Sequence, residues 1–294
     1  MLKLNEKLIR KGKPVGLPYI GSKKKISKKI IEIIKQNFII EGKVVYDIFG
    51  GGGAITCECL VNEIPVVYND HDLSVGKMFK RVLNCDRDYI KSLVVAREEF
   101  FNIKAKKDKT TTDELKLLVN SFGNNRENYI YSKEVSGLKY GLTKEILNSI
   151  DDEFNYKKNK TYIYFVKGDN IRLEQIERLS QLDRITNTKI KYLKSMKNRD
   201  YTYFSSIKNQ ILYLDPPYES TDISVYKDHK NFSHKDFYDW VVDMSKNNIV
   251  LLSSYNVYDE RFKVVFEFKK ATSTLSANGK DMSNGNYEKL YMVK

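Results

Sequence analysis

The spacing of apolar residues changes along the chain, and each change marks a predicted element. From Ile26 to Ile40 apolar residues recur at helical spacing, which predicts a helix that ends at Gly42. KVVYD and PVVYND, which end at Asp47 and Asp70, are short apolar runs rich in β-branched residues and predict buried strands. The pattern then predicts a long helical stretch, roughly over 73–107.

Four further apolar runs predict strands in the last third of the chain. They are QILYLDPPY, NIVLLSSYN, VVFEFKK and EKLYMVK. Several predicted strands end in Asp, Asn or Gly. Ligands of open α/β sheets bind at the carboxyl ends of the strands. The pattern therefore predicts an α/β fold with a Rossmann-like sheet.

The interval between the strands that end at Asp70 and Asp215 is far longer than the roughly 30 residues of a βα unit, which predicts an insertion. We place it at 104–199, between the two parts, 1–103 and 200–294, of one domain. The insertion holds 21 Lys and Arg against 13 Asp and Glu, a net +8 of the +13 of the chain. It is also rich in tyrosine, and basic residues with aromatic ones favour binding to nucleic acid. A solvated decoration is the alternative.

The composition of the whole chain limits the other classes of function. A net charge of +13 favours a polyanionic partner, nucleic acid before a membrane surface, although solubility charge explains it equally well. The chain contains no apolar run long enough to span a membrane and begins with no secretory signal, so we expect a cytoplasmic protein. Three cysteines cannot form a disulfide framework, and the three histidines are scattered, so we expect no metal.

Two features after the first strands are candidates for binding a nucleoside. Asp47 to Gly53 runs from a strand into glycines, which let the backbone approach a ligand closely. The turn lacks the Gly-Lys-Ser/Thr of a P-loop and the usual dinucleotide spacing. Asp70, at the end of the next strand, suits two ribose hydroxyls or, equally, the N-cap of a helix.

The tetrapeptide Asp215-Pro216-Pro217-Tyr218 is the most specific pattern in the chain. The two prolines fix the backbone and lack N–H donors, which leaves carbonyls as acceptors. The carboxylate adds another acceptor, and the tyrosine adds a flat ring. Acceptors beside a stacking ring suit a planar base that carries an exocyclic amino group.

Together these motifs resemble the Dam-like, D12 class of adenine-N6 DNA methyltransferases over nearly the whole chain. The resemblance implies a methyltransferase sheet with an inserted, mainly helical DNA-recognition domain. It also implies transfer of a methyl group from S-adenosylmethionine, without a metal, to the N6 amino group of an adenine flipped out of double-stranded DNA.

The same resemblance assigns residues to the methyl donor. Pro18 to Lys23 is similar to the N-terminal donor motif, although Ser22 stands where glycine is usual and Tyr19 where tryptophan is common. Asp47 to Gly53 resembles the glycine motif for the methionine moiety, and Asp70 the ribose acid. Asp200, with Asp169 as a rival, matches the residue that contacts the donor's adenine. The donor set is Tyr19, Lys23, Asp47, Phe49, Gly51, Gly53, Asp70, Asp200 and Asp215.

The resemblance also gives the groups that act on the substrate. Asp215, Pro216, Pro217 and Tyr218 form the catalytic motif. Asn120–Asn125 and Tyr129–Ser132 resemble the hairpin that reads the target strand. The DNA-binding candidates are Asn120, Arg126, Tyr131 and Ser132, and TLSANG and EKLYMV follow the family's ending.

Other functions stay open at this point. Cytosine-N4 relatives usually carry Ser at the first position of the catalytic motif, and ribosomal RNA adenine and protein-glutamine methyltransferases carry Asn. A catalytically silent DNA-binding regulator would keep the same fold. The target sequence, action as a monomer, and pairing with a restriction endonuclease are also left open.

Overall fold

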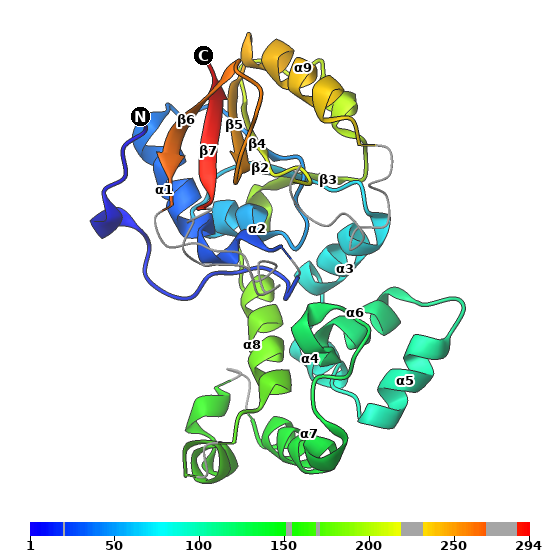
Figure 1. The fold of residues 1–294 in the computed structure, drawn as a ribbon. Coiled ribbons are helices and arrows are strands. Elements are labelled where there is room, and N and C mark those ends of the chain that lie inside the picture. Colours follow the sequence, from blue (N-terminus) through cyan, green and yellow to red (C-terminus); the bar gives the residue numbers. More distant parts are fainter. Residues whose placement is uncertain (20, 151–154, 169–170, 219–231, 269–286) are drawn as a thin grey trace. The chain divides into compact units, whose positions relative to one another are not determined.

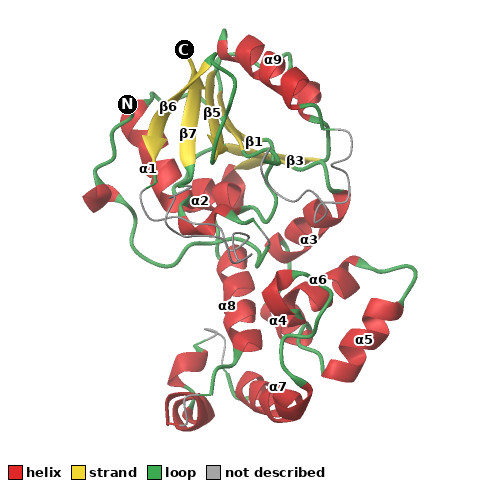
Figure 2. Ribbon diagram, viewed as in Figure 1, coloured by secondary structure: helices red, strands yellow, loops and turns green. Residues whose placement is uncertain are grey.

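The computed structural model describes residues 1–19, 21–150, 155–168, 171–218, 232–268 and 287–294 (Figure 1). The chain divides into two compact units. The first, the strand-rich unit, comprises Met1–Pro14, Lys23–Gly76 and Lys189–Lys294. The second, the helical unit, comprises Val15–Ser22 and Lys77–Thr188. The secondary structure separates in the same way, because all strands in the described residues belong to the first unit (Figure 2).

The strand-rich unit is built on a sheet that has, within the described ranges, seven strands in the order β3-β2-β1-β4-β5-β7-β6. The strands are β1 (Val45–Asp47), β2 (Val66–Asn69), β3 (Leu193–Lys197), β4 (Ile211–Leu214), β5 (Ile249–Ser254), β6 (Phe262–Glu267) and β7 (Lys289–Val293). The neighbours from β3 to β5 are parallel, while β7 is antiparallel to both β5 and β6. The strand order reverses between β1 and β4, which makes their carboxyl ends the expected ligand site.

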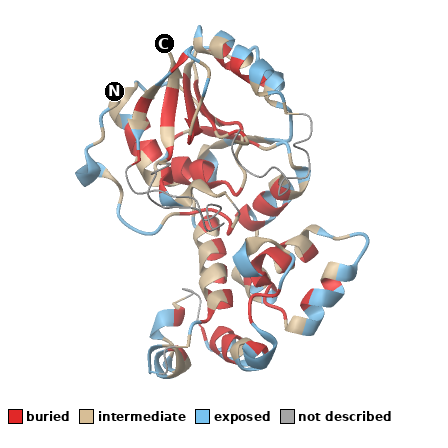
Figure 3. Cartoon of the chain, in the orientation of Figure 1, coloured by how far each residue is buried: buried red, intermediate tan, exposed pale blue. Residues whose placement is uncertain are grey.

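The two faces of the sheet are covered by different helices. Leu212, Leu214 and Leu252 pack with helix α9 (His234–Ser245) on one face. On the other face α2 (Ala54–Val61) contacts β1 and β2, and α1 (Ser27–Asn37) packs against α2. Buried residues line the strands, and the outer side of α9 is exposed (Figure 3).

The helical unit has its own core and its own helices. They are the end of α3 (Leu73–Leu83), α4 (Arg87–Ser92), α5 (Arg97–Ala105), α6 (Thr111–Asn120), α7 (Lys133–Asn148), α8 (Glu174–Thr186) and a π-helix (Tyr162–Gly168). Phe100, Leu117 and Tyr129 lie in its apolar core. No helix in the described part of the chain is long and apolar enough to cross a membrane.

The predicted α/β fold and most predicted strands are confirmed, but two helical predictions were wrong. The first helix ends at Asn37, before Gly42. The stretch over 73–107 forms three helices, α3, α4 and α5, because Asp86 caps a new helix by accepting from the backbone N–H of Tyr89.

The unit boundaries differ from the sequence-based division at 104 and 199. Helix α5 runs across position 104, and β3 pairs with β2 before position 199. Strand β3 was not predicted, because its residues are mostly half-buried and alternate with lysines, so no apolar run marks this edge strand.

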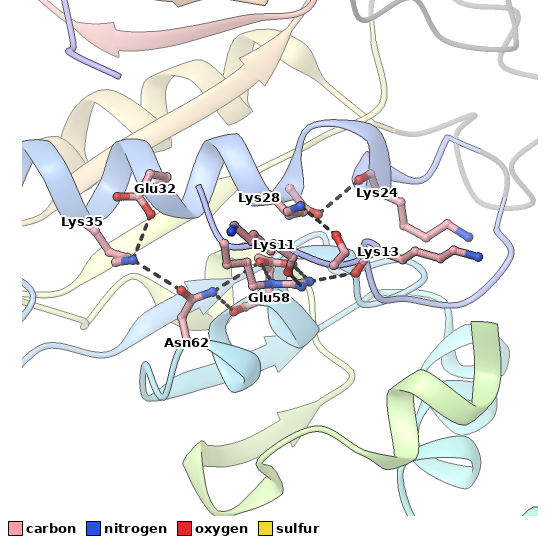
Figure 4. Close-up of polar contacts among 11 residues, drawn as sticks. Lys11, Lys13, Lys24, Lys28, Glu32, Lys35, Glu58 and Asn62 are labelled. Carbon is pink, nitrogen blue, oxygen red and sulfur yellow. Dashed lines mark hydrogen bonds and ion pairs between the residues drawn. The ribbon is translucent and has the colours of Figure 1, made fainter. Parts of the chain in front are cut away.

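The N-terminal segment is held to α2 by a buried ion pair. Arg10 donates through Nε and Nη2 to both carboxylate oxygens of Glu58, whose side chain is fully buried. The same guanidinium donates to the backbone carbonyls of Lys11 and Lys13, and Lys28 donates to the carbonyl of Gly12. Figure 4 shows this group beside α1 and α2. The ion pair thus fixes residues 10–13 against the sheet's helical layer.

Replacement of Arg10 by Ala should destabilise the strand-rich unit, because it leaves the buried Glu58 carboxylate without its guanidinium partner. We expect the free energy of unfolding to fall by about 3 kcal/mol. This value is near the lower end of the range for a broken buried ion pair, because Arg10 is partly exposed. Urea denaturation of both variants measures it. Lys29→Ala, which breaks an exposed pair with Glu6, is the control and should change the stability by less than about 1 kcal/mol. Equal stabilities of the two variants would contradict a structural role for the buried pair.

Candidate functional site

The turn after β1 lies against β2 so closely that position 50 admits only glycine. The N–H of Gly50 donates to the carbonyl of Asn69 at 2.7 Å. A Cβ atom at Gly50 would lie 2.4 Å from the buried ring of Tyr68. Gly51 and Gly53 follow with φ of 48° and 71°, in the left-handed region that glycine adopts without strain. The turn therefore brings bare backbone to the carboxyl edge of the sheet.

Asp47, at the end of β1, connects the glycine turn to the start of α2. It is buried and accepts from both the backbone N–H and the hydroxyl of Thr56, at 3.0 and 2.7 Å. Burial raises the pKa of Asp47 to about 7, although the bonds from Thr56 oppose the rise. Asp47, which was predicted to contact the methyl donor, thus holds the start of α2 in place.

Asp70 extends from the end of β2 toward the glycine turn. Its carboxylate accepts from the backbone N–H of Gly51 at 2.7 Å and of Asp72 at 2.8 Å. Burial raises the pKa of Asp70 to about 6, against these two bonds. The side chain that caps the next helix is Asp72, which accepts from Ser74. The alternative reading of Asp70 as the helix cap is therefore not what the structure shows.

Two asparagines bring the segment around Asp200 to the same edge. Asn69 donates to the carbonyl of Arg199 and accepts from its N–H, each at 2.9 Å. Asn198 donates to the carbonyl of Asp70 at 2.7 Å. The exposed Asp200 accepts from Thr202 and caps the 3-10 helix η7 (Tyr201–Phe204).

Phe49 belongs to an aromatic cluster beside this segment. Its ring lies 6.3 Å from that of Tyr201, with an angle of 30° between the two planes, and 5.6 Å from that of Phe237. Phe49 thus joins the glycine turn to η7 and α9.

Asp215, directly after β4, forms an ion pair with Lys23. The two charged groups are 2.7 Å apart, and both side chains are largely buried. The hydroxyl of Tyr218 lies 3.1 Å from the same carboxylate oxygen, and the Lys23 ammonium lies 4.9 Å from the centre of the Tyr218 ring. Burial raises the pKa of Asp215 to about 6, while Lys23 lowers it. The first and last residues of the catalytic motif are thus in contact.

The prolines of the motif are held from α9. Pro216 is buried, and Nε2 of His234, the first residue of α9, lies 3.0 Å from the carbonyl oxygen of Pro217. The sequence analysis gave His234 no role, because a histidine at a helix start signals nothing by itself.

Glu288 is a second acid that the sequence analysis did not single out. Its carboxylate accepts from Tyr218 at 2.5 Å and from Ser253 at 2.6 Å, and lies 3.8 Å from Lys23. It stands in the run EKLYMV, which was noted as a strand and as part of the family's ending but with no residue assigned a role. The sheet thus brings Lys23, Asp215, Tyr218 and Glu288 together from three separate stretches of the chain.

The DNA-binding candidates lie in the helical unit, and two of them are buried. Asn120 donates to the carbonyl of Leu93 and accepts from Gln175, and the hydroxyl of Tyr131 accepts from the N–H of Gln175. This favours a role in holding the hairpin over direct contact with DNA. Ser132 is exposed at the start of α7.

The exposed part of the same hairpin is its tip. Ser121 and Tyr129 form an antiparallel bridge, and Arg126 between them has φ of 62° and donates to Glu114. Phe122 is 68% exposed. It lies within the segment that the resemblance indicated, but its apolar side chain gave no separate signal.

Some predicted residues cannot be assessed from this site. Tyr19 belongs to the helical unit, whereas Lys23 belongs to the strand-rich unit. Asp169 and the TLSANG segment at 274–279 lie outside the described residues. Within the part of the chain that is described, no cluster of three or more His, Cys, Asp or Glu could hold a metal ion.

Comparison with known proteins identifies one family. The profile of the D12 class N6 adenine-specific DNA methyltransferases matches residues 19–258, most of the chain. No curated protein sequence matches. A solved ribosomal RNA methyltransferase, aviRa from Streptomyces viridochromogenes, aligns over 91% of this chain and 84% of its own, with 9% identity and a TM-score of 0.36. That similarity is too low to support an argument about function.

Proposed function

The chain belongs to the D12 class N6 adenine-specific DNA methyltransferase family, and on this premise we propose that it methylates an adenine flipped out of double-stranded DNA, with S-adenosylmethionine as donor. The observation that carries the proposal is the buried Asp215 at the switch point, with Lys23 and Tyr218 in contact with it. This group combines an acceptor, a cation and a flat ring at the edge where α/β sheets bind ligands.

The residues around the glycine turn fit the donor. A Cβ at position 50 would overlap the Tyr68 ring, so the turn stays bare backbone that a donor could approach, and the Asp70 carboxylate suits two ribose hydroxyls. Asp200 and Phe49, at the same edge, would hold the adenine and methionine parts. When bound, S-adenosylmethionine supplies a methyl group that its sulfonium activates.

The chain's own groups would prepare the adenine. The N6 amino group is a poor nucleophile, because its lone pair is conjugated with the ring. Hydrogen bonds from N6 to the Asp215 carboxylate and the Pro216 carbonyl would favour a pyramidal nitrogen, whose lone pair could then take the methyl group that the sulfonium of the donor releases. One N6 proton is then lost, with the Asp215 carboxylate as its first acceptor. The Tyr218 ring would stack on the flipped base.

We further propose that the helical unit reads the DNA. Support comes from the exposed Phe122 at the hairpin tip. The excess of positive charge in residues 104–199 extends into the strand-rich unit, because its last five basic residues, from Lys189 to Arg199, belong there. Arginines and lysines would bind phosphates, and Arg126 could pair with a guanine edge if it left Glu114. Sequencing of plasmid from an expressing, methylation-deficient strain, with detection of modified bases, tests which base is methylated and in which sequence.

Replacement of Asp215 by Ala should slow single-turnover methyl transfer at least about 100-fold, roughly 3 kcal/mol, because an acceptor that acts in the transition state is lost. The wild-type rate should rise with pH through about 6, since burial raises the pKa of Asp215 to that value and only the carboxylate accepts. The control is Asp243→Ala, the same change at an exposed position of α9. Near-normal transfer by the Asp215 variant would overturn the proposed function.

Replacement of Asp70 by Ala should weaken binding of S-adenosylmethionine by about 1.5–3 kcal/mol, because the ribose hydroxyls lose a charged acceptor. Isothermal titration measures the dissociation constant. Asp72→Ala, which removes the neighbouring helix cap, controls for local loosening and should bind the donor as the wild type does. An unchanged constant for the Asp70 variant would assign Asp70 to the turn alone.

Replacement of Phe122 by Ala should weaken DNA binding by about 1–3 kcal/mol, the range for loss of one aromatic contact with a base, without lowering stability. Tyr258→Ala, at an exposed tyrosine of the strand-rich unit, is the matched control. Arg126→Ala should reduce binding to a duplex that carries the target sequence more than binding to a scrambled duplex. Binding curves on both duplexes decide the matter, and unchanged affinities for both variants would move the reading surface away from this hairpin.

A further inference from the structure

Glu288 is a buried acid of the candidate site that lies beyond the residues matched by the family profile. It precedes β7 and is 5% exposed. One of its oxygens, Oε1, accepts from Tyr218 at 2.5 Å and from Ser253 at 2.6 Å. Lys23 lies 3.8 Å from the same oxygen. A surface carboxylate would not collect three such partners.

The sheet fixes where this carboxylate lies. The antiparallel register pairs Ser253 of β5 with Leu290 of β7. Because alternate residues of a strand share a face, Glu288 lies on the same face as Leu290 and Ser253. The N–H of Phe268 also donates to the carbonyl of Glu288 at 2.9 Å. The backbone therefore holds Glu288 next to the end of β4.

The Tyr218 hydroxyl has a single hydrogen but two carboxylate neighbours. Its oxygen lies 2.5 Å from Glu288 and 3.1 Å from Asp215. A distance near 2.5 Å is typical of an O–H bonded to a carboxylate, so the hydrogen belongs to the bond with Glu288. Asp215 then keeps capacity to accept from another donor.

We propose that Glu288 is a positioning residue for methyl transfer: it takes the hydroxyl hydrogen of Tyr218 and holds that ring and Lys23 beside Asp215, which leaves the Asp215 carboxylate for the adenine amino group. This inference rests on the proposed function and adds a residue to its site. Glu288 itself does not touch the base in this scheme.

The charge of Glu288 also acts on Asp215. The ionisable groups that face Asp215 are Lys23, Tyr218, Glu288, Tyr213 and Asp47. Burial is the largest cause of the raised pKa of Asp215, Lys23 lowers this pKa, and Glu288 raises it. Removal of the Glu288 charge should therefore lower the pKa of Asp215, and activity should persist to lower pH.

The test is single-turnover methyl transfer by the full chain on duplex DNA with Glu288→Gln. We expect the plateau rate to fall roughly 10- to 100-fold, as for a displaced reacting group, with the donor's dissociation constant unchanged. The acidic limb of the pH profile should move to lower pH. Glu267→Gln makes the same change at an exposed residue of β6, which stands opposite Lys289 of β7 in the sheet. This control variant should match the wild type in both readouts. A wild-type rate, or a slower rate with an unmoved limb, would overturn the positioning role.

A second comparison decides the matter should Glu288→Gln fail to fold. Glu288→Asp keeps the charge but draws it back from the Tyr218 hydroxyl, so it should slow transfer with the acidic limb near its wild-type position. In a Tyr218→Phe background, which lacks that hydrogen, Glu288→Asp should slow methyl transfer by a much smaller factor. Equal losses in the two backgrounds would overturn the proposal.

Asp215→Ala separates the two proposals. If that variant is inactive while Glu288→Gln behaves as wild type, only the role of Glu288 fails. If Asp215→Ala stays active, the proposed function fails, and the role of Glu288 fails together with it.

Discussion

The close approach of the backbone at Gly50 to β2 is the constraint on which the candidate site depends. The N–H of Gly50 bonds to Asn69, and the Tyr68 hydroxyl donates to the carbonyl of Gly51 at 2.9 Å. The turn is thereby held by two contacts from β2, and the N–H of Gly51 donates to Asp70. Helix α2 starts immediately afterwards at Ala54. Asp70, the glycine turn and the first turn of α2 are therefore held together, and a side chain at position 50 would displace all three.

Burial of acids at this edge gives the site its electrostatic character. The pKa values of Asp47, Asp70 and Asp215 are all raised, and burial is the largest cause in each case. A low-dielectric site that holds carboxylates favours cationic partners, because each one offsets the cost of keeping the acids ionised. Lys23 does so for Asp215. A sulfonium-bearing donor would add positive charge to the same region, in keeping with the proposed reaction.

The sequence predicted what local patterns determine. Apolar runs that end in polar residues located β1, β2 and β4, and the two prolines after Asp215 singled out the turn that follows β4. Strand β3 escaped detection, because an edge strand with lysines has no apolar run. Glu288 escaped for another reason: only the antiparallel pairing of β5 with β7 brings it to Asp215. Contacts that arise from strand order cannot be read from spacing along the chain.

The hairpin of the helical unit shows that residue type alone does not tell whether a polar side chain is exposed or buried. Asn120 and Tyr131 have the polar groups that DNA contact requires, yet those groups satisfy backbone N–H and C=O groups inside the unit. Buried backbone groups must find partners, and polar side chains at the base of a turn are the nearest source. Such residues fix the shape of the hairpin. Under the proposed function, contact with DNA would then fall to side chains that project outward from the hairpin, such as the exposed Phe122.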